Sequence, residues 1–284
     1  YHTRRNMLRA ALETPKTDPR EQALARTLGL PDLVVRVMLA RGIEDPEQAK
    51  SFLRPDLGSL HDPFKFTQMQ RAVDRIRDSL RSGDPILIHG DYDADGISGT
   101  VLLHKFLCLL HGTSRPFIPA RADGYSFSGA SVKAIQDGGF PLVISVDNGT
   151  NAIAPIAELK RSGVDVIVTD HHGTTENVAD AYCVLNPRLP DAGYPDRDLA
   201  GCGVAFCLVA AMAESLSGSM RRSSEFSDFL VDALAYVALG TVADVAPLGG
   251  ENRTLVFHGL RSLNVSRNPG IRALMDSAGL LHRG

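Results

Sequence analysis

The apolar and polar positions of the chain follow two different periods, and the change falls near residue 84. Before it, apolar residues recur at helical spacing, which predicts helices rather than strands. Asp45 followed by Pro46 is typical of a helix start, with the acid as N-cap and proline in the first turn. The helices are expected at Glu21–Leu28, Leu33–Ala40, Pro46–Phe52 and Gln68–Leu80. Residues 1–83 are therefore predicted to form an N-terminal arm followed by a helical subdomain.

After Pro85, short and continuously apolar runs alternate with helical segments. Such runs are typical of strands buried on both faces, and their alternation with helices predicts an α/β fold with a mostly parallel sheet covered by helices on both faces. The strands are expected at Ile86–Gly90, Arg115–Pro119, Pro141–Val146, Val164–Thr169 and Tyr182–Leu185. The helices are expected at Ile97–Leu110, Ser128–Gln136, Ala152–Arg161, Phe206–Leu216, Phe229–Leu239, 251–263 and 269–279. Residues 84–284 are assigned to this second domain.

Three of the predicted strands end in acidic groups. Parallel strands bring their carboxyl ends to one edge of the sheet, where ligands of open α/β folds bind. A lone acid after a strand is usually an N-cap or a turn residue, but three such ends in succession favour a shared metal site. Asp244 follows a helical segment, so it either caps the next element or reaches the same site. The residues expected at this edge are Asp91, Asp93, Asp95, Asp147, Asp170, His171 and His172.

Crowded carboxylates repel one another, so the fold must hold a cation among them or leave them in water as a solvated acidic turn. An EF-hand loop is disfavoured, because the acids follow a strand and no glutamate closes a twelve-residue loop. Carboxylates with imidazole suit Mn²⁺ or Mg²⁺, and imidazole favours Mn²⁺. With this many acids, two metals about 3.5–4 Å apart are plausible, the arrangement used for in-line attack on phosphorus, with Asp147 as their bridge. His172 then either contacts the transition state and protonates a leaving group, or is a supporting histidine.

The amino-acid composition limits the classes of protein to which the chain can belong. Hydrophobic content of 44% with 22% charged residues is typical of a soluble globular protein, and no apolar run of membrane-spanning length is evident. The four cysteines lack CxxC spacing and are expected to be buried free thiols in a cytoplasmic protein. The net charge of −3 and the lack of tryptophan neither indicate nor exclude nucleic-acid binding.

Four motifs in order resemble those of the DHH phosphoesterase superfamily, and in detail those of the RecJ-like single-stranded-DNA-specific exonucleases. They are residues 91–96 (DYDADG), 145–149 (SVDNG), 170–173 (DHHG) and 240–244 (GTVAD). The resemblance implies a metal-dependent phosphodiester hydrolase that removes 5′-mononucleotides from single-stranded DNA in the 5′ to 3′ direction, in DNA repair and recombination. RecJ-like proteins continue into a DHH-associated domain and an oligonucleotide-binding fold, so residues 84–284 are expected to be the DHH catalytic domain alone.

The resemblance also implies roles for individual residues. Asp91 and Asp170 would be ligands or lie directly behind them, and His89 matches a histidine ligand of other superfamily branches. His172 would face the scissile phosphate, with Asp147 and Asp170 as further catalytic residues. The expected ligands of two divalent metals, Mn²⁺ or Mg²⁺, are Asp93, Asp95, Asp147, His171 and Asp244.

Substrate contacts and partners are predicted from the same comparison. Arg121 and Arg188 are candidate phosphate contacts, although surface solvation is the commoner role of a single arginine. Tyr125 is a candidate for stacking on a base, and it is equally compatible with a role as a loop anchor. A monomer is expected, with single-stranded DNA as substrate, a single-strand-binding protein and a helicase as partners, and no membrane. Two alternatives stay open: a nanoRNase or cyclic-dinucleotide phosphodiesterase of the same superfamily, and a non-catalytic replication scaffold derived from it.

Overall fold

The chain divides into two compact units, Tyr1–Pro55 and Asp56–Gly284. The computed structural model describes residues 18–121, 124, 126–174, 177–217 and 224–280, so the predicted arm at residues 1–17 lies outside it. The unit boundary falls before the predicted division at residue 83. The reason is that α4 (Met69–Ser82) buries Met69, Val73 and Ile76 in the core of the second unit.

From residue 18 onward, the first unit contains three short helices, α1 (Glu21–Leu28), α2 (Asp32–Ala40) and α3 (Pro46–Leu53). Leu24 of α1 packs against Val35 and Leu39 of α2 in a small apolar cluster. Asp45 caps α3 as predicted, because its carboxylate accepts hydrogen bonds from two backbone N–H groups of the first turn.

Five parallel strands form the sheet of the second unit, in the order β2-β1-β3-β4-β5. The strands are β1 (Ile86–Gly90), β2 (Ser114–Phe117), β3 (Leu142–Val146), β4 (Asp165–Thr169) and β5 (Cys183–Leu185). This confirms the parallel sheet predicted from the apolar runs. The chain turns from β1 to β2 on one side and then returns to β3 on the other, so the topological switch point lies between β1 and β3, where ligands of such sheets bind.

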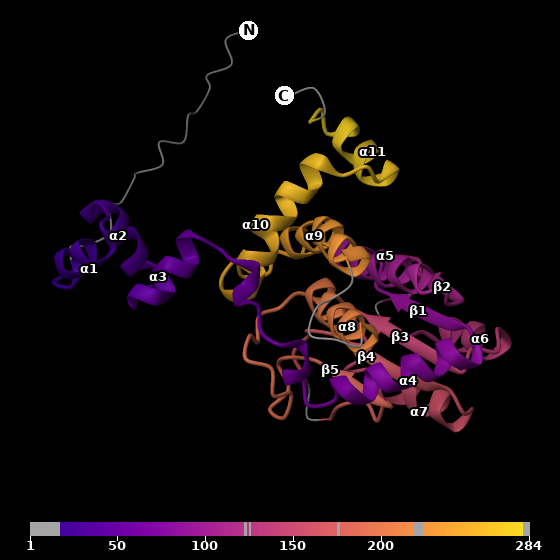
Figure 1. Cartoon of the computed structure of the whole chain (residues 1–284). Coiled ribbons are helices and arrows are strands. Elements are labelled where there is room, and N and C mark those ends of the chain that lie inside the picture. Colours follow the sequence, from indigo (N-terminus) through magenta and orange to yellow (C-terminus); the bar gives the residue numbers. More distant parts are fainter. Residues whose placement is uncertain (1–17, 122–123, 125, 175–176, 218–223, 281–284) are drawn as a thin grey trace, which may run out of the picture. The chain divides into compact units, whose positions relative to one another are not determined.

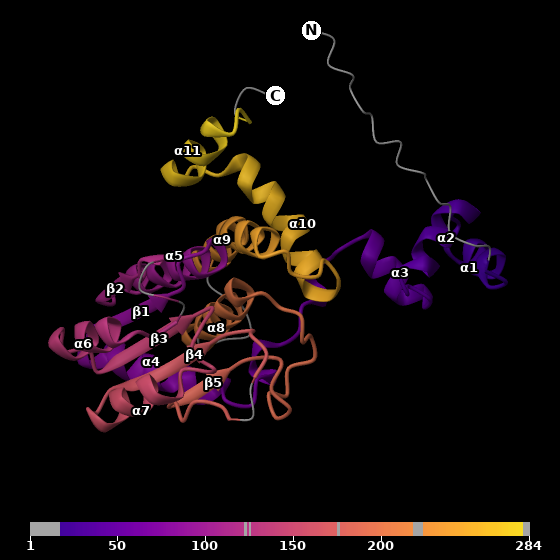
Figure 2. The same ribbon diagram turned by 180° about the vertical axis from the view of Figure 1, so that it is seen from behind.

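Alternate residues of each strand face opposite layers of helices. Ile88 and Ile144 belong to the core shared with α4, α5 (Ala94–Leu109) and α8 (Gly201–Leu216), whereas Leu87 and Val143 pack in a second cluster. That second cluster includes apolar residues of α6 (Gly129–Asp137) and α7 (Ile153–Arg161). The layering is visible from both sides (Figures 1 and 2). Helices therefore cover both faces, as the alternating pattern predicts.

The helical remainder of this unit differs in detail from the prediction. Its elements are η1 (Leu57–Ser59), η2 (Pro63–Lys65), α9 (Ser224–Ala243), α10 (Gly250–Val265) and α11 (Pro269–Ser277). Helix α9 extends to Ala243, so the fourth motif lies on a helix and Asp244 directly follows it. Helix α8 begins at Gly201, five residues earlier than expected, because the glycines that disfavour a helix allow close packing at its start.

Among the described helices, α9 alone has the length and apolar composition to cross a membrane, although no such run was predicted. Half of its apolar window is buried inside the protein, and Leu234 and Val237 lie in the main core. Its apolar character is therefore that of a core helix.

Close packing of α9 against α10 gives a test of the fold. A methyl group on Gly259 would clash with the backbone carbonyl of Leu234, whereas one on Gly129 would meet no atom within 4 Å. We expect Gly259→Ala to lower the free energy of unfolding by about 1–3 kcal/mol, because overpacking exceeds the gain in helix propensity. Urea denaturation measures this, with Gly129→Ala as the matched control, expected within about 0.5 kcal/mol of wild type or more stable. Equal stability of both variants would contradict close packing of the two helices.

Candidate metal centre

The carboxyl ends of β1, β3 and β4 bring their acidic residues together at the switch point. Carboxylate or imidazole atoms lie within 4.8 Å of one another in each of three groups. The groups are Asp91, Asp93 and Asp147; Asp95, His171 and Asp244; and Asp147, His171 and His172. Asp244 reaches the strand-end acids from the end of α9, which decides between the two roles that its sequence position left open.

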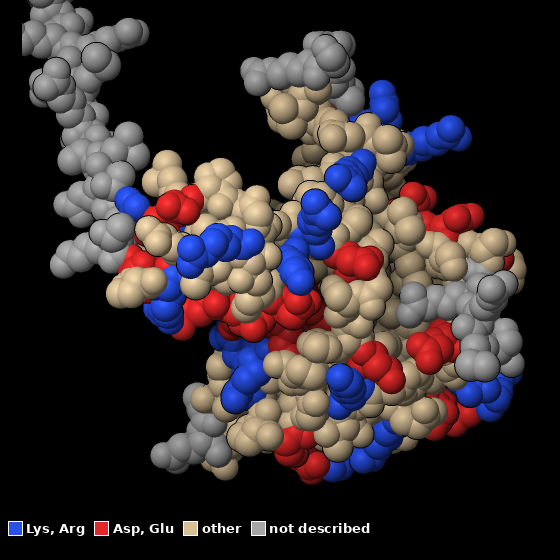
Figure 3. Space-filling view, turned by 60° about the vertical axis from the view of Figure 1, so that its left-hand side comes forward, with Lys and Arg blue, Asp and Glu red and all other residues tan. Residues whose placement is uncertain are grey.

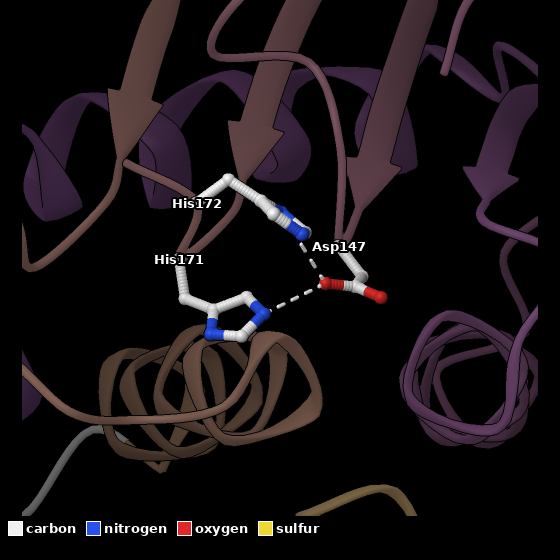
Figure 4. Close-up of side chains that lie close together, drawn as sticks. All are labelled: Asp147, His171 and His172. Carbon is white, nitrogen blue, oxygen red and sulfur yellow. Dashed lines mark ion pairs between the residues drawn. The ribbon is translucent and has the colours of Figure 1, made fainter. Parts of the chain in front are cut away.

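Asp147 and His171 lie at the centre of this arrangement. The Nε2 atom of His171 lies 3.1 Å from Asp147 Oδ1 and 3.8 Å from both Asp95 Oδ2 and Asp244 Oδ2. Figure 4 shows both His171 and His172 directed toward the same carboxylate oxygen of Asp147, which lies 3.7 Å from His172 Nδ1. One carboxylate is therefore shared between the neighbouring groups, as a bridging ligand must be.

Asp93 serves both the helix and the site. Its Oδ1 atom accepts hydrogen bonds from the backbone N–H groups of Asp95 at 2.9 Å and Gly96 at 3.0 Å, which makes Asp93 the N-cap of α5. The carboxylate has a second oxygen, and each oxygen has two acceptor positions. The N-cap and ligand interpretations of this residue are therefore compatible.

Asp95 is fully buried and is held by the start of α8. Its Oδ2 accepts the backbone N–H of Gly201 at 2.7 Å, and its Oδ1 accepts that of Cys202 at 2.9 Å. The positive end of the helix dipole also favours a carboxylate at this point. These amides fix the carboxylate in place, while lone pairs on its oxygens can still bind a cation.

Asp170 holds His171 and His172 in place through hydrogen bonds. Its Oδ1 accepts hydrogen bonds from the backbone N–H groups of His171 and His172 and from the His172 ring at 2.8 Å, and its Oδ2 accepts the Thr150 N–H. Burial alone would raise the pKa of Asp170, but the hydrogen bonds from His172 and Thr150 outweigh it and lower the pKa below its usual range. The same hydrogen bond raises the pKa of His172.

Two residues of this supporting layer were not predicted. The side-chain amide of Asn186 donates to Thr150 Oγ1 and to the backbone carbonyl of His172, each at 3.0 Å. Asn186 directly follows β5, so it is a fourth polar residue at a strand end. The tendency of polar residues to follow strands, applied to β5, would have identified it.

Burial and like charge disfavour ionisation of the central acids. Burial first, and then the charges of Asp95 and Asp93, raise the pKa of Asp147 to about 10. Burial likewise raises the pKa of Asp91 and of Asp244. Asp147 has a left-handed backbone with φ of 61°, and a methyl group on Gly201 would lie 2.7 Å from its Cβ. The fold thus packs α8 tightly against a carboxyl group that a cation would stabilise as a carboxylate.

The donor atoms fit divalent cations. His171 is 6% exposed, and neither of its ring nitrogens makes a hydrogen bond, although Nε2 faces the carboxylates. A buried imidazole without a hydrogen bond is costly unless another partner is supplied. Imidazole among several carboxylates is a donor set suited to Mn²⁺ and also acceptable to Mg²⁺.

His89 belongs to no metal-binding group among the described residues. Its ring is fully buried and stacks on Phe127 at 4.2 Å and on Phe117 at 5.3 Å between centroids. Burial lowers the pKa of His89 to about 4. The structure therefore places this histidine in an aromatic cluster and not among the ligands.

Two of the predicted substrate-binding residues, Arg121 and Arg188, contact residues next to the site. The guanidinium group of Arg121 stacks over the ring of Tyr92, 5.0 Å from its centroid, and Tyr92 lies between Asp91 and Asp93. Arg188 follows Asn186 by two residues, and its backbone N–H donates to the Asn186 side chain at 2.9 Å. Tyr125 lies outside the described residues.

Comparison with known proteins identifies the class of this site. The family model described as DHH family, N-terminal domain, matches residues 85–241. This range contains the first three motifs and the first two residues of the fourth. The chain therefore belongs to the DHH family.

Its relatives include single-stranded-DNA-specific exonucleases named RecJ. The chain is 33% identical to RecJ of Bacillus subtilis over 273 residues, which cover 96% of this chain and 33% of that protein. It is 36% identical to RecJ of Dickeya dadantii over 252 residues, 87% of this chain and 43% of that protein. The chain thus spans less than half the length of these relatives.

Solved structures agree with this relationship. RecJ of Thermus thermophilus in complex with Mn²⁺ matches with a TM-score of 0.74 and 30% identity, over 94% of this chain and 37% of that one. The same protein in complex with Mg²⁺ matches with a TM-score of 0.63 and 28% identity, over 94% and 33%. The predicted fold class is confirmed.

Because Asp147 is buried among other acids, we expect it to lower the stability of the metal-free protein and to strengthen the binding of a cation. We expect Asp147→Asn to raise the free energy of unfolding of the metal-free protein by about 1–2 kcal/mol, because an amide replaces a buried acid among other acids. Mn²⁺ at about 100 times its Kd should stabilise the wild type by about 2.7 kcal/mol and should not stabilise this variant. Thermal unfolding in EDTA and in Mn²⁺ measures both effects, with the exposed Asp228→Asn as control. Equal Mn²⁺ stabilisation of Asp147→Asn and wild type would contradict a ligand role for Asp147.

Proposed function

We propose that the chain is the catalytic part of a metal-dependent 5′ to 3′ exonuclease that releases 5′-mononucleotides from single-stranded DNA in repair and recombination. One observation carries the proposal: acids from β1, β3 and α9 converge with His171 and His172 at the switch point, in the motif order of the DHH family. The similarity to RecJ proteins over nearly the whole chain supports the choice of substrate.

The ligand roles follow from the grouping of the side chains. We assign one metal subsite to Asp91, Asp93 and Asp147, and a second to Asp95, His171 and Asp244. Two divalent cations bound there, Mn²⁺ or Mg²⁺, would stabilise the charge that develops on the phosphate and lower the pKa of a water molecule. The protein contributes a rigid frame, since helix amides hold Asp95 and the α5 cap holds Asp93.

His172 has the position and ionisation suited to a general acid. Asp170 accepts a hydrogen bond from Nδ1 and raises the pKa of the ring, which favours the imidazolium form that a general acid needs. Water attacks the phosphorus, the bond to the 3′-oxygen of the terminal nucleotide breaks, and Nε2 of His172 donates a proton to that oxygen. The side chain of His172 is 38% exposed, so a bound phosphate can reach it.

Contacts with the DNA strand are proposed at the rim. Arg121, stacked on Tyr92, can pair with a phosphate beside the first motif. The guanidinium groups of Arg188 and Arg197 each donate to the other's backbone carbonyl, which rigidifies a second basic position in the loop after β5. On the face seen in Figure 3, basic and acidic side chains lie side by side.

Further expectations stay predictions. They are a monomeric state, association with a single-strand-binding protein and a helicase, and stacking by Tyr125. A cytoplasmic location is supported by four free cysteines, although Cys108 is exposed, unlike the buried thiols expected. A dinucleotide phosphodiesterase differs from the proposed enzyme in its products, and a scaffold would have no use for the intact set of acids.

Digestion of 5′-labelled single-stranded DNA tests the activity. With Mn²⁺ we expect mononucleotides as the labelled product, no degradation of blunt duplex, and no activity in EDTA. Asp147→Asn should lower the rate by at least about 10³-fold, because the shared ligand is lost. Asp228→Asn should retain the wild-type rate. Cleavage confined to dinucleotides would favour the alternative enzyme, and equal rates for both variants would refute the proposed site.

Kinetics of His172→Ala test the general acid. We expect kcat to fall about 10²–10⁴-fold, the usual contribution of proton transfer. Activity should recover partly on substrates whose leaving group has a low pKa, such as a 4-nitrophenyl phosphodiester, because such a group needs no proton. A uniform loss on both substrate types would mean that His172 holds a metal or the structure and does not transfer a proton.

A further inference from the structure

Asn252 of α10 lies outside every metal-binding group of the described residues, yet it is 1% exposed and bonds two loops of the site. Its Nδ2 donates to the backbone carbonyls of Asp198 at 2.5 Å and Pro247 at 3.1 Å. Its Oδ1 accepts the backbone N–H of Ala200 at 3.3 Å. Both donors and the acceptor of this buried amide are therefore used, and all of its partners are backbone groups.

The first of these loops leads to Asp95. Ala200 is directly followed by Gly201 and Cys202, the two residues whose N–H groups hold the Asp95 carboxylate. A shift of Ala200 would carry both amides with it. The hydrogen bond from Ala200 to Asn252 thus fixes the start of α8. Through the N–H groups of the next two residues, it also fixes the orientation of the Asp95 carboxylate.

The second loop leads to Asp244. Pro247 follows Asp244 by three residues in the connection between α9 and α10. Within this connection Val245 is 84% exposed and has φ of 59°, a left-handed conformation that is unfavourable for a β-branched residue. Such a conformation persists only when neighbouring contacts hold it, and the bond from Asn252 to the Pro247 carbonyl is one of these contacts.

We propose that Asn252 is a positioning residue that fixes Asp95 relative to Asp244 and thereby controls ion binding at the subsite that they form with His171. The proposal rests on the proposed metal-dependent function. The subsite of Asp91, Asp93 and Asp147 is built from the ends of β1 and β3, whereas the hydrogen bonds of the Asn252 side chain lead to the start of α8 and to the connection after α9. Because Gly201 also packs against Asp147, loss of Asn252 affects both subsites, but it weakens the ion at Asp95 and Asp244 more than the other.

Isothermal titration of the full chain with Mn²⁺ tests this, using wild type, Asn252→Leu and Asn252→Asp. Leucine removes all three hydrogen bonds, whereas aspartate keeps an acceptor for Ala200 and turns a carboxylate toward the other two carbonyls. We expect the wild type to bind two ions, and each variant to bind one of them about 10–100-fold more weakly, with a smaller change in the affinity for the other. Asn264→Asp, at an exposed position of the same helix, should leave both affinities unchanged. Near-ultraviolet circular dichroism in EDTA establishes that each variant is folded, and the aspartate variant decides the test if the leucine variant is not.

The outcomes separate the two proposals. A wild type that binds no Mn²⁺ refutes the proposed function itself. A wild type that binds two ions, with Asn252 variants that bind both equally well or lose both equally, leaves that function standing and overturns the positioning role. A wild type with one ion also overturns it, because two subsites are required. Selective weakening should also appear as a higher Mn²⁺ requirement for DNA digestion, with kcat restored at saturating Mn²⁺.

Discussion

Repulsion among buried carboxyl groups at the ends of β1 and β3 is the constraint on which this site depends. Burial and neighbouring charge raise the pKa of Asp147 to about 10, so the fold alone does not stabilise it as a carboxylate. The structure answers this cost in two ways. Helix amides bind Asp95 and Asp93, and donor atoms are left facing a position where a cation can bind. The buried carboxyl groups lower the local stability of the fold and can bind a cation, a combination that is common at functional sites.

The strands and the strand-end acids were predictable because both depend on local sequence. Buried parallel strands need continuous apolar runs, and parallel topology then brings their ends together. The start of α8 was not predictable, because Gly201 disfavours a helix and becomes favourable only through close packing on Asp147. Asn252 could not be found either, since its backbone partners Ala200 and Asp198 lie 52 and 54 residues away in the sequence.

The N-cap role of Asp93 is compatible with a ligand role. A carboxylate has about four acceptor positions, and Asp93 uses one oxygen to start α5, so its other oxygen stays available to a cation. Donors engage both oxygens of Asp170 and also both oxygens of Asp95. These two residues differ in their neighbours, because Asp95 groups with His171 and Asp244, whereas no metal-binding group of the described residues contains Asp170.

The aromatic surroundings of His89 have a consequence for how closely packing and charge are combined at the end of β1. The ring stacks on both Phe117 and Phe127, and burial lowers its pKa to about 4, so the side chain contributes a flat apolar volume. Asp91, two residues away, groups instead with Asp93 and Asp147. Two positions of one strand end thus separate a side chain of the aromatic core from a carboxyl group of the candidate site.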